Sequence, residues 1–348
     1  MDLTYGAEAE AFRKHVRAFL KENWAPKGVE RGAMGAYVSA FRLKATEAGY
    51  LYRGIPKEFG GSEQAPDVIT AQVIREEFAR AYAPMEVSGN GMNMLVPTLL
   101  ERGTQKQKDL FIRPTMAGEY VWGQGYSEPG TGSDLASVRT KGELKDGKWI
   151  INGQKIWTSQ GGKATHMFAL IRTEPDAGKH DGISYLLIDL NQPGITRSPI
   201  RQMTGESGFY EFFFDNAETP ADWIVGERGE GWNVSRTTLK HERASIGSAA
   251  GLGGQFDKLV ELAKEVQRNG RPAIEDPLIR EALGKIEGWV MAHRYSSYRI
   301  MSNAIAGETA GNITLMMKLL LTEIGHDMAL TAQDILGDEA LIEPAPAG

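Results

Sequence analysis

Residues 125–134 form the densest group in the chain that could bind a ligand. They read Gly-Tyr-Ser-Glu-Pro-Gly-Thr-Gly-Ser-Asp, which brings glycines, hydroxyl side chains and carboxylates close together. Because glycine has no Cβ, backbone N–H groups in such a segment can approach a flat ring or a phosphate. A surface loop of turn-forming residues has the same composition. The segment matches neither the P-loop nor the dinucleotide-binding Gly-x-Gly-x-x-Gly pattern, so it predicts neither of those sites.

A second group, residues 152–161, reads Asn-Gly-Gln-Lys-Ile-Trp-Thr-Ser-Gln-Gly. Asn152 and Gly153 favour a hairpin turn, which would be followed by Trp157 and the hydroxyls of Thr158 and Ser159. An indole can stack on a planar cofactor, and a hydroxyl can bind one of its heteroatoms. A tryptophan among β-rich neighbours is also typical of the buried face of a strand, so both interpretations stay open here.

A run of charges, Lys-His-Glu-Arg at residues 240–243, is the third candidate. Taken alone, it is typical of the solvated face of a helix. The histidines are isolated along the chain, and their spacing does not predict a metal site. No Gly-x-Ser-x-Gly pattern is present, so the sequence does not predict a serine hydrolase.

Three zones of the chain must position these groups. Residues 1–120 carry apolar residues at helical spacing, and Thr104 is a candidate N-cap. Residues 121–232 alternate short β-rich runs with turns, and the pair Asp146 and Gly147 indicates a hairpin. This pattern predicts a small barrel or sandwich.

The third zone, residues 233–348, is helical again. Long periodic stretches at 234–263, 277–306 and 312–336 are joined by glycine and proline, which predicts an antiparallel bundle. The fold class is therefore α+β with several domains, in the order helices, β-domain, helix bundle.

Composition excludes several kinds of protein. The 348 residues carry a formal net charge of −6, which argues against a protein that binds nucleic acid through a basic face. The chain has no cysteine, so disulfides, thiolate metal sites and cysteine nucleophiles are excluded, and a reducing cytoplasm is the expected location. No apolar run approaches the roughly 20 residues that span a bilayer, and we expect no signal peptide.

Read together, residues 125–134 and 152–161 resemble the acyl-CoA dehydrogenase family of flavoproteins. Further segments similar to this family run along nearly the whole chain, at residues 55–61, 97–99, 103–108, 194–196, 205–206, 212–216, 226–227 and 231–232. The resemblance implies an N-terminal helical domain, a middle β-barrel and a C-terminal four-helix bundle, which agrees with the three zones. We expect the last helix of that bundle to be missing, because the tail at 343–348 looks like a loop.

The resemblance also implies FAD and the residues that bind it. Tyr126 and Ser127 would lie along the flavin and meet its pyrimidine edge, while Trp157 and Ser159 would lie on its far side near N5. Tyr126 replaces the aliphatic residue common in the family, so its backbone is the expected contact. Further expected positions are Gly132 in the flavin loop, Arg271 at the FAD pyrophosphate and Ser133 along the CoA moiety of the substrate.

The implied reaction removes a proton from the carbon α to a thioester and transfers a β-hydride to flavin N5, which requires a carboxylate base. Many members carry this base in a C-terminal Tyr-Glu-Gly-Thr-like motif, which the chain does not contain. Others carry it in a Glu-Arg pair on the first bundle helix, as isovaleryl-, long-chain and some steroid-side-chain members do. Glu242 is therefore the expected base, with Arg243 supporting the geometry.

Besides the missing last helix, two features depart from the family pattern. Residues 267–272 replace the Arg-x-x-Phe-Gly loop, and Asp334 and Asp338 stand where a Gln-x-x-Gly-Gly pattern is usual, so one pyrophosphate contact would be repulsive. Segments 32–35 and 85–94 are candidates to line the acyl pocket. The Glu-Arg base position favours branched, cyclic or bulky acyl groups.

The expected partners are an acyl-CoA substrate and an electron-transfer flavoprotein as acceptor, within a homo- or heterotetramer built as a dimer of dimers. Two alternatives stay open. One is a non-catalytic or half-site subunit of a heterotetramer, in which the partner completes the FAD site. The other is a flavin oxidase or monooxygenase on the same fold.

Overall fold

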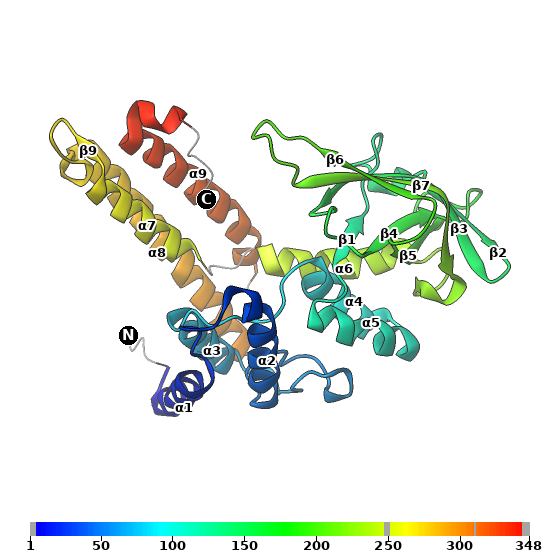
Figure 1. Cartoon of the computed structure of the whole chain (residues 1–348), viewed down its shortest axis with the longest axis horizontal. Coiled ribbons are helices and arrows are strands. Elements are labelled where there is room, and N and C mark those ends of the chain that lie inside the picture. The colour runs from blue at the N-terminus through cyan, green and yellow to red at the C-terminus, as the bar shows by residue number, and fades with distance from the viewer. Residues whose placement is uncertain (1–4, 247–250, 310, 343–348) are drawn as a thin grey trace. The chain divides into compact units, whose positions relative to one another are not determined.

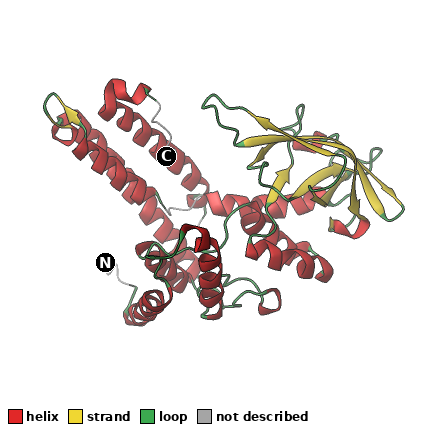
Figure 2. Ribbon diagram, viewed as in Figure 1, coloured by secondary structure: helices red, strands yellow, loops and turns green. Residues whose placement is uncertain are grey.

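A computed structural model describes residues 5–246, 251–309 and 311–342. The chain divides into two compact units, Met1–Glu242 and Arg243–Gly348. Figure 1 shows the elements of each unit, and Figure 2 shows that the strands of the large sheet lie within the first. Among the described residues, no helix is long and apolar enough to cross a membrane.

The first unit begins with a series of helices. They are α1 (Ala7–Asn23), η1 (Arg31–Ala33), α2 (Met34–Glu47), η2 (Lys57–Phe59), α3 (Val68–Arg80), the π-helix η3 (Gly91–Leu95), α4 (Val96–Arg102) and α5 (Gln105–Ala117). Val16 and Leu20 of α1 lie in a buried core that continues into α2 and α3. The expected N-cap of α5 is confirmed, because Thr104 and Gln107 form a capping box.

The β-rich zone forms one eight-stranded sheet in the order β6-β7-β3-β2-β4-β5-β8, with β1 paired to β4. The strands are β1 (Trp122–Gly125), β2 (Lys141–Lys145), β3 (Lys148–Ser159), β4 (His166–Arg172), β5 (Ile183–Asp189), β6 (Ile195–Ile200), β7 (Phe209–Pro220) and β8 (Ile224–Val225). Short 3-10 turns, η4 (Leu135–Ser137) and η5 (Ala221–Trp223), interrupt the connections. Apolar residues of α4 and α5, such as Leu99 and Phe111, share a core with Phe168 and Tyr185 of the sheet.

One of the two expected hairpins is confirmed and the other is wrong. Asp146 and Gly147 form the turn between β2 and β3, with positive φ angles of 49° and 78°. Asn152 and Gly153 instead lie inside β3, where the pairing with β7 shifts register. A Cβ on Gly153 would lie 2.7 Å from Thr140 Cα, so glycine permits close approach of two segments here rather than a turn.

The second unit contains α7 (Leu252–Glu265), α8 (Pro277–Ile305) and α9 (Ile313–Leu336), with a hairpin of β9 (Gln267–Arg268) and β10 (Arg271–Pro272). The turns η6 (Ala273–Glu275) and η7 (Gly337–Leu341) complete it. The expected single stretch at 234–263 is wrong, because it contains two helices, α6 (Gly231–Ile246) and α7. Residues 247–250 between them lie outside the described part of the chain.

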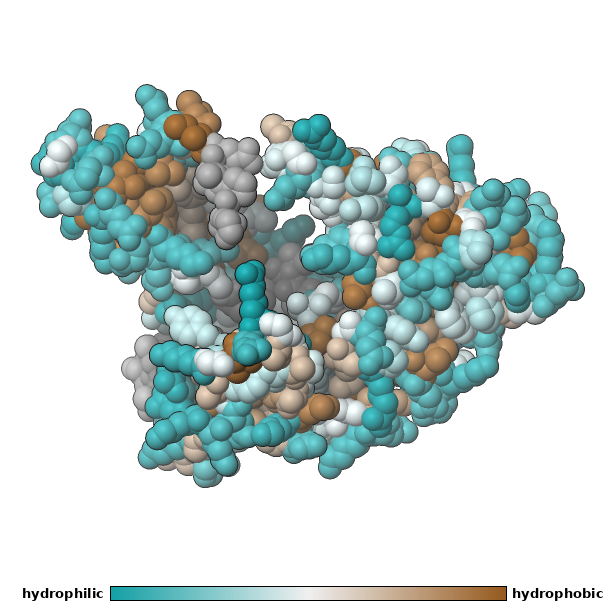
Figure 3. All heavy atoms as spheres, in the orientation of Figure 1, coloured by the Kyte–Doolittle hydropathy of each residue, from teal (hydrophilic) through white to brown (hydrophobic). Residues whose placement is uncertain are grey.

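The helices of the second unit share a buried core and also expose apolar side chains. The core includes Leu259, Ile286 and Met328, one from each long helix. Figure 3 shows apolar surface among the polar atoms of this unit. The exposed apolar side chains on α8 and α9 are Leu278, Trp289, Tyr295, Leu315, Met316, Leu319 and Leu330.

Candidate active site

The glycine-rich segment follows β1 directly. Gly125 ends that strand opposite Ala169 of β4, and a Cβ on Gly125 would lie 2.3 Å from Met167 Sδ, so no side chain fits there. Beyond it, Glu128 and Thr131 exchange two backbone hydrogen bonds of 2.9 Å each and close a tight turn. Gly132 is exposed, and a Cβ there would meet nothing within 4 Å. The segment is therefore closely packed at Gly125 and exposed to solvent after the turn at residues 128–131.

The structure brings the two candidate groups side by side. The backbone N–H of Ile156 donates a hydrogen bond of 2.9 Å to the carbonyl of Ser127. Thr158 donates through its hydroxyl to the carbonyl of Gln124 at 3.1 Å. The segments around residues 125–128 and 155–159, some 30 positions apart in sequence, therefore form one surface.

Trp157 points out of the sheet because β3 is irregular at that point. The pairing with β7 shifts register between Lys155 and Thr158, and both of these side chains are fully buried. Trp157 lies between them with a left-handed φ of 63°, and 56% of it is exposed. A left-handed backbone is rare for a bulky residue, and such conformations concentrate at functional sites. The bulge thus presents an indole and the exposed Ser159 to whatever binds here.

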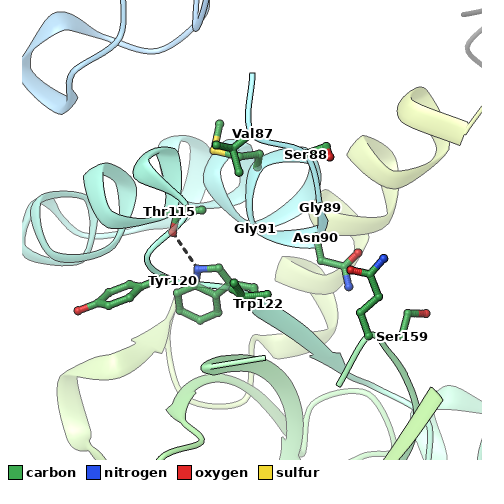
Figure 4. A pocket seen from close by; sticks show the side chains of 13 residues that line it. Val87, Ser88, Gly89, Asn90, Gly91, Thr115, Tyr120, Trp122 and Ser159 are labelled. Carbon is green, nitrogen blue, oxygen red and sulfur yellow. Dashed lines mark hydrogen bonds between the residues drawn. The ribbon is translucent and has the colours of Figure 1, made fainter. Parts of the chain in front are cut away.

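A cavity of about 170 Å³ opens next to Ser159. It lies between the η3 segment and the start of β1, and Figure 4 shows the side chains around it. The lining residues are 87–92, Thr115, Gly118, 120–122, Ser159 and Gln160. Gly91 must be glycine, because a Cβ would lie 2.6 Å from Trp122 Cδ1 and 2.7 Å from Thr115 Cγ2. Trp122 is fixed by a 2.8 Å hydrogen bond from its indole N–H to Thr115 Oγ1 (Figure 4).

Helix α6 carries Glu242, and hydroxyl groups on the same face of this helix form hydrogen bonds to α4 and to the sheet. One turn before Glu242, the buried Thr238 lies 3.0 Å from the hydroxyl of Thr98 on α4 and donates to Tyr185 Oη at 3.3 Å. His241 Nε2 lies 2.7 Å from Glu101 Oε1, which adds a second link between α6 and α4. The half-buried Glu242 side chain therefore stands on a helix whose rotation is fixed.

Tyr126 and Glu242 are electrostatic neighbours. The Tyr126 ring is buried in the core against Phe168 and Tyr185. Burial raises the pKa of its hydroxyl well above the usual value, and the negative charge of Glu242 raises it further. The predicted base and the predicted flavin loop thus lie close together within the first unit.

The other predicted residues occupy separate places. Ser133 is exposed just beyond the Glu128 turn, and Arg271 is exposed on β10 of the second unit. Arg243 belongs to α6, but its side chain lies outside the described part of the chain. Among the described residues, no group of three or more histidine, aspartate or glutamate side chains could hold a metal ion.

Sequence reasoning missed two residues that the structure draws attention to. Lys155 is fully buried, and its ammonium pairs with the buried Glu128 at 2.8 Å. Both lie inside the two candidate groups, but neither was assigned a role. The only signal in the sequence was a lysine within an otherwise β-rich run.

Comparison with known proteins identifies the family. Three family descriptions match in succession: "Acyl-CoA dehydrogenase, N-terminal domain" over residues 6–119, the middle domain over 123–217 and the C-terminal domain over 229–347. Acyl-CoA dehydrogenase IpdE1 of Mycobacterium tuberculosis is 38% identical over 97% of this chain and 88% of its own. The chain belongs to the acyl-CoA dehydrogenase family. The expected family and fold are thereby confirmed, and the protein is an oxidoreductase.

Solved structures of acyl-CoA dehydrogenases share the fold. The ChsE4-ChsE5 complex from Mycobacterium tuberculosis matches with a TM-score of 0.76 at 26% identity, over 99% of this chain and 88% of that chain. A protein described as the Tcur3481-Tcur3483 steroid ACAD matches with a TM-score of 0.76 at 28% identity, over 99% and 89% of the two chains. One structural relative of this acyl-CoA dehydrogenase is therefore a two-component complex, and another is described as a steroid ACAD.

Acyl-CoA dehydrogenases are flavoproteins, and the residues present here fit a flavin. An exposed indole held out by a bulge suits a flat ring, and the hydroxyls of Ser127 and Ser159 suit its polar edge. Gly132 is exposed and a Cβ there would meet nothing within 4 Å, so a ligand can approach its backbone. The domain boundaries expected near residues 120 and 232, and the individual site assignments, stay predictions.

Proposed function

We propose that this acyl-CoA dehydrogenase uses FAD to convert an acyl-CoA thioester into the trans-2-enoyl-CoA, with Glu242 as the base. The observation that carries the proposal is the docking of α6: Thr238, one turn before Glu242, donates to Tyr185, whose ring packs against Tyr126 of the glycine-rich segment. That proximity sets a carboxylate beside the loop that the family uses for the flavin. A substrate bound against that flavin would bring the carbon α to its thioester within reach of this carboxylate.

The residues of this chain hold the reactants rather than supply redox chemistry. Trp157 would cover the flavin, Ser127 and Ser159 would bind its heteroatoms, and Tyr126 would contribute its backbone. Gly132 leaves room for the ring, and Arg271 would neutralise the FAD pyrophosphate. When bound, FAD supplies the acceptor for the β-hydride.

Glu242 moves the proton. Its carboxylate takes the α-proton of the thioester, while Arg243 supports the local geometry and Ser133 contacts the CoA moiety. The links from Thr238 to Thr98 and Tyr185 stop α6 from rotating, so the carboxylate stays aimed at one point.

Bulky acyl groups, including steroid-derived ones, are the proposed substrates. The similarity to a protein described as a steroid ACAD supports this class, as does the Glu-Arg pair at residues 242 and 243. We propose an electron-transfer flavoprotein as electron acceptor and the cytoplasm as location.

Assembly into a tetramer, a dimer of dimers, is the proposed quaternary state. The exposed apolar side chains of α8 and α9 suit burial against other subunits. The match to the ChsE4-ChsE5 complex favours the second candidate, in which the chain is one subunit of a heterotetramer and a different partner completes the FAD site.

Anaerobic flavin bleaching by acyl-CoA tests the base. Glu242→Gln should retain bound flavin but slow bleaching by about 100-fold or more, because a general base contributes on the order of 10²–10⁴ in rate. Glu261→Gln, which removes an exposed carboxylate from α7, is the matched control and should bleach normally. Unchanged bleaching in Glu242→Gln would exclude Glu242 as the base. Fast reoxidation of the bleached flavin in air would favour an oxidase instead.

A further inference from the structure

Lys155 is a charged residue in the interior of the sheet. Its side chain is 0% exposed, and all three protons of its ammonium have acceptors. The ammonium donates to Glu128 Oε1 at 2.8 Å, to the Leu170 carbonyl at 2.7 Å and to the Tyr126 carbonyl at 3.2 Å. One side chain of β3 thus holds both β4 and the segment that follows β1.

Glu128 is equally well bound. Its Oε1 accepts from the backbone N–H of Thr140 at 2.9 Å, and its Oε2 accepts from that of Arg139 at 2.7 Å. Burial works to raise the pKa of Glu128, but Lys155 and the two amides outweigh it and hold the pKa below its usual value. Burial lowers the pKa of Lys155 to about 8, although Glu128 opposes this, so both groups are charged at neutral pH.

Stability alone does not explain a buried ion pair of this kind. Desolvation of two charges offsets most of their attraction, and apolar replacements of similar volume are often neutral or stabilising. In some proteins such a pair fixes one arrangement of the backbone, and the contacts made here are of that type.

The contacts fasten three successive residues to β3. Tyr126 is held through its carbonyl by Lys155, Ser127 through its carbonyl by the N–H of Ile156, and Glu128 through its carboxylate by Lys155. The next residue of β3 is Trp157, whose outward position depends on the bulge that begins at Lys155. The ion pair therefore joins the two segments that the proposed function assigns to the flavin.

We propose that Lys155 and Glu128 are positioning residues that set the flavin-binding backbone at residues 126–128 relative to Trp157. This inference rests on the proposed function, because it concerns the same flavin. Neither side chain is exposed enough to bind the ring, so both act through the backbone they hold.

The test compares flavin binding in two neutralising double variants. Lys155→Met/Glu128→Gln removes the buried pair and leaves no unpaired buried charge. Lys148→Met/Glu218→Gln removes an exposed pair between β3 and β7, in which the charged atoms lie 2.5 Å apart. The readouts are the dissociation constant of FAD, the visible flavin spectrum and the flavin midpoint potential, with thermal unfolding measured alongside.

The buried-pair variant should bind FAD about 10-fold or more weakly and shift the flavin spectrum, because a hydrogen bond to a charged group is worth on the order of tenfold or more. The surface-pair variant should behave as the unaltered protein. FAD binding and spectrum that stay unchanged in a folded Lys155→Met/Glu128→Gln protein would overturn the inference.

A shorter carboxylate gives a second route if that double variant does not fold. Glu128→Asp keeps the charge but retracts it by one methylene, and it should loosen FAD while retaining the fold. Unchanged FAD affinity in Glu128→Asp would equally overturn the inference. If the unaltered protein, assembled with its partner subunit where it has one, binds no FAD, the proposed function fails, whereas unchanged FAD binding in the variants alone removes only the role of the ion pair.

Discussion

Glu77 offers a quantitative test of how the N-terminal helices hold together. This residue of α3 is buried, with its carboxylate 2% exposed, and it accepts charged hydrogen bonds from three arginines. Arg13 and Arg17 of α1 lie 3.0 and 2.7 Å away, and Arg80 of α3 lies 2.8 Å away. Since two of the three come from α1, the cluster ties α1 to α3.

The pKa of Glu77 sets the size of the effect. Burial alone would raise it, but the hydrogen bonds from Arg17, Arg13 and Arg80 outweigh burial and lower the pKa from 4.5 to about 2. A shift of that size corresponds to about 3 kcal/mol of folding free energy at neutral pH. Two of the arginines are half-exposed, so solvent screening reduces the expected value to about 2 kcal/mol.

The sign follows from the lowered pKa. Between pH 4.5 and 2 the unfolded carboxylate is protonated while the folded one stays charged, so stability is lost as pH falls through this window. Glu77→Gln should therefore lower the free energy of unfolding in urea by about 2 kcal/mol at pH 7. The difference from the unaltered protein should shrink below pH 4.5 and vanish near pH 2.

Glu10→Gln is the matched control, because Glu10 also pairs with Arg13, at 3.2 Å, but is half-exposed. It should cost less than about 1 kcal/mol, as exposed pairs do. The reasoning is refuted if Glu77→Gln costs no more than Glu10→Gln, or if its cost does not change with pH.

Two further predictions concern the cavity and the interior of the sheet. Gly91→Ala should lower the free energy of unfolding, measured by urea titration, by about 1–3 kcal/mol, because the new Cβ would displace Trp122. Gly284 is a helical glycine with open space around it, so Gly284→Ala is the control and should not destabilise the protein in the same titration. Burial lowers the pKa of His166, although Asp189 opposes this. Below about pH 6.5 the unfolded state therefore binds a proton at this histidine more readily than the folded state, and the protein loses stability as the pH falls. His166→Gln should thus reduce the fall in melting temperature between pH 7 and 5, and an unchanged fall would contradict this assignment.

Much of the fold could be predicted from the sequence, because local signals and the tertiary structure agree there. The capping box at Thr104 and the hairpin at Asp146 and Gly147 both depend on neighbours within a few residues. Periodicity predicts one helical stretch at 234–263, although Gly251, Gly253 and Gly254 fall within it. Periodicity reports which face is apolar, and it does not report where one helix ends and the next begins.

The candidate site was predictable only in part, for a reason that β3 makes plain. Alternation along a strand puts Trp149, Ile151, Lys155 and Trp157 on one face. It therefore predicts that Lys155 and Trp157 are either both buried or both exposed. The structure has neither: Lys155 is buried, and the bulge after it exposes Trp157 and buries Thr158 instead.

A single irregular step thus reverses the faces of residues 157–159 at the end of β3. At this step the Lys155 ammonium donates to three acceptors, from Tyr126, Glu128 and Leu170, which lie 15 to 29 positions away in the chain. No window of sequence around β3 contains those acceptors. The outward tryptophan and the inward lysine are therefore one tertiary feature, and a variant that removes the ion pair should disturb Trp157 before it disturbs the fold.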